Sequence, residues 1–157
     1  MVASGAIRKQ LAELLDRLKG RFGDGLVTIA VFGSRARGEA SAGSDLDLLV
    51  VADGLPGSRL DRQLLLLGLA REVSEDFADL VAFVPLSSEE ASRVQPFYLG
   101  MLSGHELLHD RDGFFSSVLG RLRRRLAELG SRRLVDEDGY EYWDLKPDWK
   151  PGDVVEL

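Results

Sequence analysis

Residues 33–47 read GSRARGEASAGSDLD, and this stretch decides the fold because a compact apolar run lies at each of its ends. The first run, residues 26–32, and the second, residues 45–51, both have the length of a β-strand. The residues between the two runs are small and polar, which predicts a loop with room for one helical turn. The stretch is therefore predicted to form a strand–loop–strand unit.

Two carboxylates at the start of the second predicted strand indicate a metal site. Side chains alternate between the two faces of a strand, so Asp45 and Asp47 point the same way while Leu46 points into the core. Two acidic groups side by side on an apolar strand repel each other unless a cation lies between them. Oxygen ligands at this separation suit Mg²⁺ or Mn²⁺.

A third strand is predicted over residues 79–84, and it begins with Asp79. If this strand is the neighbour of the second one, Asp79 can join the acidic pair. Three carboxylates can hold two metal ions about 4 Å apart, an arrangement that supports in-line phosphoryl or nucleotidyl transfer.

The loop itself has the composition of a phosphate-binding site. Gly33 lets backbone N–H groups approach a phosphate closely, and Ser34 adds a hydroxyl at the start of a helical turn. Arg35 and Arg37 can supply cationic forks for a triphosphate, although each is also an ordinary surface arginine by type. A phosphate cradle and a metal-binding pair thus lie within one strand–loop–strand unit.

The rest of the chain predicts helices around this unit. Apolar residues at helical spacing predict helices over residues 6–19, 60–73 and 115–129, whereas residues 96–103 favour no element. The predicted order is helix, strand, strand, helix, strand and then mainly helix, which is typical of an α/β domain with a small mixed sheet.

Composition fits one globular domain without disulfides. The chain has 157 residues, no cysteine, and no apolar run long enough to cross a bilayer, so we expect a cytoplasmic location and no membrane partner. The whole net charge of −6 lies after residue 135, where eight acidic residues face only Lys146 and Lys150. We therefore divide the chain into a domain, residues 1–135, and an acidic tail, residues 136–157, and nucleic acid is not expected as a direct partner.

The tail also concentrates aromatic residues, and the last predicted helix concentrates arginines. Aromatic and acidic groups dock well on arginines, in the same chain or across a dimer, and the same aromatics can anchor a partner protein. Both interpretations stay open, as does a homodimer or a hetero-oligomer. The residues concerned are Tyr140, Tyr142, Trp143 and Trp149 in the tail and Arg121, Arg123, Arg124 and Arg125 in the helix.

Gly33-Ser34, ten further residues and then Asp45-Leu46-Asp47 resemble the active-site signature of the DNA polymerase beta nucleotidyltransferase superfamily. The spacing is most similar to that of minimal nucleotidyltransferase (MNT) antitoxins, which occur with HEPN ribonuclease toxins. The resemblance spans about residues 5–110 and implies a small mixed β-sheet of polymerase-beta type with flanking helices.

The resemblance also implies roles for the residues. Asp45 and Asp47 would bind two Mg²⁺ ions, and Asp79 would hold the catalytic metal and help to activate an acceptor hydroxyl. Gly33 and Ser34 would bind the β- and γ-phosphates of ATP, the expected substrate. Further candidates for nucleotide binding are Arg35, Arg37 and Ser44. Antitoxins of this kind transfer AMP to a tyrosine of the toxin and so silence its RNase activity.

Two other functions remain open. One is an antitoxin that neutralises its partner by binding alone. The other is a small-molecule nucleotidyltransferase of the aminoglycoside type, which would need a substantial substrate domain.

Residues 105–109 read HELLH, the pattern of a zinc protease. That chemistry needs both histidines on one face of a helix, and the segment is bracketed too closely by Gly104 and a turn to form a secure helix. In the resembling family this region is a short strand, so we do not expect zinc.

Overall fold

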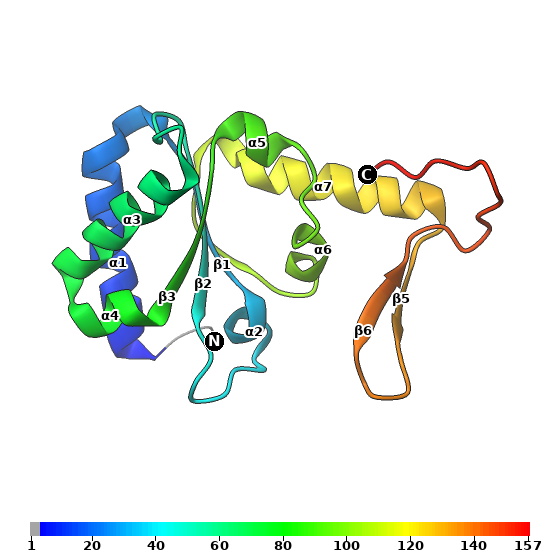
Figure 1. Ribbon diagram of the computed structural model, residues 1–157, viewed down its shortest axis with the longest axis horizontal. Coiled ribbons are helices and arrows are strands. Elements are labelled where there is room, and N and C mark those ends of the chain that lie inside the picture. The colour runs from blue at the N-terminus through cyan, green and yellow to red at the C-terminus, as the bar shows by residue number, and fades with distance from the viewer. Residues whose placement is uncertain (1–3) are drawn as a thin grey trace.

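The computed structural model describes residues 4–157, and its centre is a mixed four-stranded sheet of order β3-β2-β1-β4 (Figure 1). Strand β1 pairs antiparallel with β2 and β4, whereas β2 pairs parallel with β3. The strands are β1 (Leu26–Phe32), β2 (Leu46–Ala52), β3 (Val81–Leu86) and β4 (Glu106–Asp110). The α/β class and the mixed sheet predicted from the sequence are confirmed.

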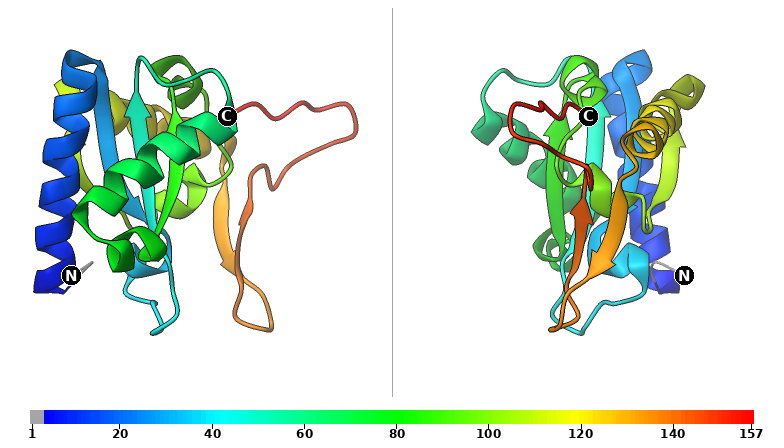
Figure 2. Two further views of the ribbon diagram at one scale, coloured as in Figure 1. Left: turned by 60° about the vertical axis from the view of Figure 1, so that its left-hand side comes forward. Right: turned by 90° about the vertical axis from the view of Figure 1, so that its right-hand side faces the viewer.

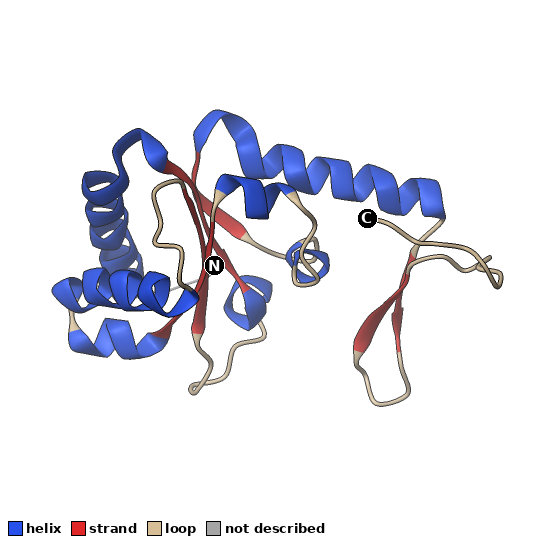
Figure 3. Cartoon of the chain, turned by 45° about the horizontal axis from the view of Figure 1, so that its top comes forward, coloured by secondary structure: helices blue, strands red, loops and turns tan. Residues whose placement is uncertain are grey.

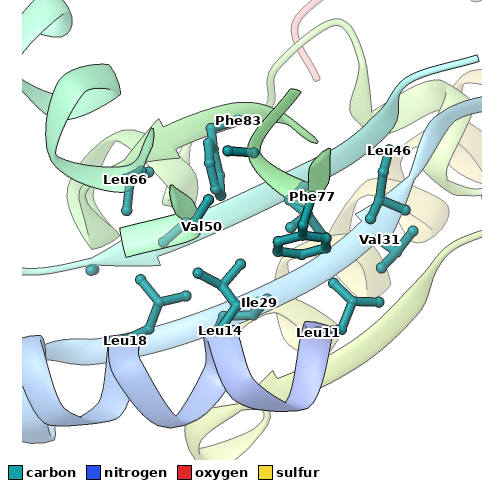
Figure 4. Packing of buried hydrophobic residues seen from close by; sticks show 14 of the residues in the cluster. Leu11, Leu14, Leu18, Ile29, Val31, Leu46, Val50, Leu66, Phe77 and Phe83 are labelled. Atoms are coloured by element: carbon teal, nitrogen blue, oxygen red, sulfur yellow. The ribbon is translucent and has the colours of Figure 1, made fainter. Parts of the chain in front are cut away.

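One face of the sheet is covered by α1 (Gly5–Phe22), α3 (Arg59–Val73) and α4 (Glu75–Leu80). Helix α1 buries one leucine stripe because its apolar residues recur at steps of three and four. Figure 4 shows that stripe, Leu11, Leu14 and Leu18, against Ile29 and Val31 of β1. The helices predicted over residues 6–19 and 60–73 are thus confirmed, and their ends differ from the observed ones by at most three residues.

The other face is covered by α5 (Ser88–Ser92), α6 (Tyr98–Met101) and α7 (Phe114–Leu129), so helices lie on both sides of the strands (Figure 3). The segment that the sequence left undecided contains α6. Tyr98 is fully buried there and its hydroxyl donates to the Ala91 carbonyl at 2.9 Å. Because that donor is satisfied, the ring can fill the core without a polar penalty.

The third strand begins later than predicted. Residues 79 and 80 belong to α4, and β3 starts at Val81. Ser74 caps α4 by accepting from the amide of Phe77 at 3.1 Å, and Phe77 is buried under the sheet. The prediction that Asp79 opens a strand is therefore wrong; it lies exposed in the last turn of a short capped helix.

The histidine pair does not lie on a helix. Strand β4 contains His109, and His105 lies just before it with Nδ1 2.8 Å from the Met101 carbonyl oxygen. Strand geometry separates residues four apart by about 13 Å, so the two imidazoles cannot share one helical face. The expectation of a short strand here is confirmed.

Asp110 joins β4, β1 and α7. Its carboxylate accepts from the Thr28 hydroxyl at 2.9 Å and from the amides of Phe115 and Ser116 at 2.8 and 3.0 Å. Burial raises the pKa of Asp110, but these hydrogen bonds outweigh it and leave the pKa below its ordinary value. A short helical turn, η2 (Arg111–Gly113), leads from this residue into α7.

We expect Asp110→Ala to lower the free energy of unfolding by about 2 kcal/mol, because it removes a helix cap and leaves the buried Thr28 hydroxyl unpaired. A lowered folded-state pKa means that this stabilisation is present above the ordinary pKa and is lost as the pH falls through the folded value. Urea unfolding from pH 7 to pH 2 checks both points. The wild type should lose more stability than Asp110→Ala over that range, and equal losses would contradict the assignment.

After α7 the chain forms an antiparallel hairpin, β5 (Arg132–Val135) and β6 (Glu141–Asp144), that sequence analysis did not predict. Its turn contains Gly139 with φ +86°, so the Asp138-Gly139 pair was the available signal. The tail contacts the body of the same chain: Trp143 packs against the α7 side of the core, and Arg125 donates to the Glu156 carbonyl. The boundary between residues 135 and 136 stays a prediction and falls in the turn of this hairpin.

Within residues 4–157, no helix combines the length and the apolar character that a bilayer crossing requires.

Candidate active site

The predicted loop and acidic pair meet at one edge of the sheet. Strand β1 runs directly into α2 (Gly33–Arg37), and its last residue, Phe32, pairs with Asp47 at the start of β2. Gly33 has φ +74°, and a β-carbon built on it would overlap Oδ2 of Asp47 and lie 3.0 Å from its Cγ. The glycine is therefore required twice, for the left-handed backbone and for the close approach of the carboxylate.

The two carboxylates differ in exposure. Asp45 is exposed and Asp47 is partly buried, while Leu46 between them is fully buried in the opposite direction. Burial and the negative charge of Asp45 raise the pKa of Asp47, and the nearby Arg37 guanidinium lowers it in part. The ionised form of Asp47 is thus disfavoured, because it lies beside the negative charge of Asp45 and is partly removed from water.

This donor set fits Mg²⁺. Magnesium in nucleotide-dependent enzymes is typically bound by one or two carboxylates together with the substrate phosphates. Among residues 4–157, no three His, Asp or Glu side chains lie close enough to hold a metal by themselves. Asp45 and Asp47 would therefore hold the ion with phosphate oxygens completing its shell.

Arg35 braces the loop. Its Nε and Nη2 both donate to the Ser44 carbonyl, at 3.0 and 2.7 Å, and so tie α2 to the residue before Asp45. The Ser44 hydroxyl in turn accepts from the Ser41 amide at 2.9 Å. Phosphate binding by Arg35 and Ser44 stays a prediction, and the fork of Arg35 positions the acidic pair.

Arg37 lies at the other end of α2 and donates fewer side-chain hydrogen bonds than Arg35. Its Nε donates to Glu39 at 2.8 Å, and its charge reaches Asp47. Gly104 packs beneath it, because a β-carbon there would lie 3.1 Å from the Ala36 carbonyl. Arg37 is thus a cation between the acidic pair and the surface.

Phe97 supports the site and was not predicted. Its ring stacks on Phe32, with centroids 5.2 Å apart, immediately before Gly33. The two phenylalanines are far apart in sequence, so no local pattern links them. The contact fixes the end of β1 from which the loop starts.

Asp79 is not brought into the cluster. In the parallel pairing of β2 with β3, the residue opposite Asp47 is Ala82, and the residue opposite Leu46 is Val81. Asp79 precedes that edge by two residues on α4. Its role as a third carboxylate stays a prediction.

Asp79→Asn tests that role. If Asp79 assists the acceptor hydroxyl, the variant should lower the rate of nucleotidyl transfer by about 10²-fold, with an unchanged unfolding midpoint because the side chain is exposed. Asp76→Asn, an equally exposed carboxylate on the same helix, is the matched control. Equal rates for the two variants would show that Asp45 and Asp47 act without Asp79.

The burial of Asp47 and its repulsion by Asp45 predict that this residue lowers the stability of the fold while it serves activity. Its raised pKa means that ionisation at neutral pH opposes folding when no cation is present. We therefore expect Asp47→Asn to raise the metal-free unfolding midpoint by about 2–4 °C. Thermal scans with EDTA and with Mg²⁺ check this prediction; Mg²⁺ should stabilise the wild type and not the variant. A lower midpoint for Asp47→Asn in EDTA would contradict it.

A glycine-backed turn, a pair of carboxylates on the adjacent strand and a mixed sheet define a nucleotidyltransferase. Residues 11–99, more than half of the chain, match the family model described as a nucleotidyltransferase domain. The chain belongs to this family and is a nucleotidyltransferase enzyme.

A relative in Methanocaldococcus jannaschii, named "Putative protein adenylyltransferase", is 32% identical over 137 residues, which cover 86% of this chain and 93% of that protein. Similar solved structures include an MNT antitoxin in complex with a tri-AMPylated HEPN toxin from Shewanella oneidensis, with a TM-score of 0.48 and 16% identity over 79% of this chain and 92% of that one. Another is a toxin–antitoxin with AMP-PNP, with a TM-score of 0.48 and 17% identity over 74% and 90% of the two chains.

Proposed function

We propose that this protein is an Mg-ATP-dependent adenylyltransferase that transfers AMP to a hydroxyl of a partner protein. The observation that carries the proposal is the packing of Asp47 against Gly33, which sets a metal-binding pair beside a phosphate loop. The relative named for protein adenylyltransfer supports a protein acceptor. The resemblance of the motif to that of MNT antitoxins implies a HEPN-type toxin as that partner, a tyrosine as its acceptor, and an antitoxin role for this chain.

The residues would act as follows. Gly33 and Ser34 bind the β- and γ-phosphates, and Asp45 and Asp47 hold Mg²⁺ against the triphosphate. Magnesium supplies charge neutralisation at the phosphate oxygens when it is bound. Arg37 adds positive charge at the opposite end of α2 and partly offsets the rise that burial and Asp45 cause in the pKa of Asp47.

The transfer exchanges a phosphoanhydride bond of ATP for a phosphoester bond to the acceptor. The acceptor hydroxyl oxygen forms a bond to the α-phosphorus, and the bond from that phosphorus to the oxygen shared with the β-phosphate breaks. Pyrophosphate leaves in line with the incoming oxygen. The hydroxyl proton passes to a carboxylate, and we assign this role to Asp79.

A protein acceptor suits the architecture. Within residues 4–157, the polypeptide that follows the four-stranded sheet consists of α7, one hairpin and a short terminal segment. The acidic pair opens to the surface through exposed Asp45. A large acceptor can therefore bring its own surface to the site.

Label transfer tests the reaction type. The chain is incubated with a HEPN-type candidate partner protein, Mg²⁺, and ATP labelled at either the α- or the γ-phosphate. Adenylyl transfer labels the partner from the α-position alone, whereas label from the γ-position would indicate a kinase. Tight binding without label from either position would favour an antitoxin that acts by binding alone.

A further inference from the structure

A cavity of about 450 Å³ lies between α2 and the C-terminal hairpin. Figures 1 and 2 show the hairpin descending from the end of α7 to the level of α2. One wall comes from the nucleotidyltransferase core and the other from the hairpin turn, which lies outside the matched residues 11–99. The lining residues are Arg37, Glu39, Gly100, Ser103, Gly139, Tyr140 and Glu141.

The cavity is close to the proposed triphosphate site. Helix α2 has Gly33 at one end and Arg37 at the other, and at 1.5 Å per residue these lie about 6 Å apart along its axis. Arg37, at the end of α2 away from Gly33, lines the cavity together with Glu141 of the hairpin. A nucleotide with its phosphates at Gly33 can therefore direct its nucleoside toward this space.

The hairpin presents an aromatic ring to the cavity. Tyr140 is 72% exposed, and its backbone is fixed at both ends of the turn: its amide donates to Oδ1 of Asp136 at 2.8 Å, and its carbonyl accepts from the Asp136 amide at 2.9 Å. Within residues 4–157 no aromatic ring is stacked on it. A rigidly mounted, solvent-facing ring offers a stacking surface for a nucleobase.

The remaining walls leave room for a flat ligand with polar edges. A β-carbon at Gly139 would meet nothing within 4 Å, and one at Gly100 would meet only the Arg37 guanidinium at 4.0 Å. Ser103 and Glu141 add a hydroxyl and a carboxylate for the polar edge of a base. The Arg37 guanidinium lies on the core side, where a cation can face a ring.

We propose that this cavity is the nucleobase subsite of the enzyme, with the base stacked on Tyr140 and covered by Arg37. The inference rests on the proposed use of ATP and adds a residue of the C-terminal hairpin to the nucleotide site. The occupant is the base of the nucleoside triphosphate; a side chain of the acceptor protein is the competing occupant that the test distinguishes.

Tyr142 provides a matched control. It belongs to the same hairpin and is 49% exposed, but it does not line the cavity. Its neighbour Trp143 packs toward α7, so the alternation of β6 turns Tyr142 the other way. Tyr142→Ala therefore removes an exposed tyrosine ring without touching the proposed subsite.

Calorimetric titration of the full chain measures the subsite directly, with Mg²⁺ and two probes, the ATP analogue AMP-PNP and inorganic tripolyphosphate. Tyr140→Ala should weaken AMP-PNP binding about 10-fold, within the range found when a stacked ring is removed. Tyr140→Phe and Tyr142→Ala should change it by less than about 2-fold, since both keep the stacked ring. Tripolyphosphate, which has no base, should bind all four proteins equally.

Unchanged AMP-PNP affinity in Tyr140→Ala would overturn the subsite and leave the proposed function intact, as would an equal loss for AMP-PNP and tripolyphosphate. In those cases the cavity is open to the acceptor protein. A wild-type chain that binds neither probe would overturn the proposed function, and the subsite with it.

Discussion

Replacing Asp45 or Asp47 by asparagine should lower the rate of nucleotidyl transfer by about 10³-fold or more, equivalent to about 4 kcal/mol of transition-state stabilisation. The side chains keep their shape in this change and lose the charge that holds Mg²⁺ against the triphosphate. Because Asp47 packs against Gly33, the loss occurs where the metal site and the phosphate loop meet. Steady-state release of pyrophosphate in the presence of the acceptor checks the rate.

Two controls accompany that measurement. Asp76→Asn removes a carboxylate that is exposed on α4, away from the pair, and should leave the rate within about 2-fold of the wild type. The double variant Asp45→Asn/Asp47→Asn should be no worse than the worse single variant by more than a small factor, since residues that act as a unit do not add. A single variant with near wild-type activity would place the metal elsewhere.

Gly33→Ala should cost at least about 10²-fold in activity, because the new methyl group occupies the position of Oδ2 of Asp47 and displaces the carboxylate by roughly 1 Å. The positive φ of +74° adds backbone strain of about 1–2 kcal/mol. The effect on activity should exceed the effect on the unfolding midpoint, since the displaced group is the proposed metal ligand.

Gly38→Ala separates the two causes. Gly38 ends α2 with the same φ of +74°, but a β-carbon there would meet nothing within 4 Å. It should therefore show the backbone strain, a loss of stability of about 1 kcal/mol, with activity within a few-fold of the wild type. Equal losses of activity in the two variants would mean that strain, and not the contact with Asp47, is what Gly33 avoids.

The strand–loop–strand unit was predictable because its signals are local. Gly33 and Asp47 are close in sequence, and the alternation of the second strand assigns Asp47 and Leu46 to opposite faces without any tertiary information. The mixed sheet was predicted from the order of the helices and strands along the chain. The observed sheet edge then brings the glycine and the carboxylate into contact.

The start of the third strand was not predictable from hydrophobic pattern alone. Residues 74–80 combine a serine cap with two early acidic residues, which favours a helix, while the apolar residues that follow favour a strand. The cap decided the outcome, so Asp79 ended on α4 rather than beside Asp47. The hairpin was missed for a different reason: the acidic composition of its turn and second strand concealed a regular antiparallel pairing.

The cavity at Arg37 depends on a long-range arrangement that no motif encodes. Arg37 belongs to the loop that the sequence identified, and Tyr140 belongs to the tail that was expected to dock on α7 or on a partner. The tail contacts the core beside α7 through Trp143, and its hairpin turn also reaches the level of α2 (Figure 2). A C-terminal segment can thereby contribute to a site whose acidic pair lies more than ninety residues earlier.

The intact mass of the partner protein tests the central claim most directly. The partner is incubated with Mg-ATP and with either the wild-type chain or the Asp45→Asn/Asp47→Asn variant, and its mass is compared with that of the untreated partner. We predict a gain of one or more AMP units with the wild type and no gain with the variant. A partner that is bound tightly by both proteins and modified by neither would contradict the account.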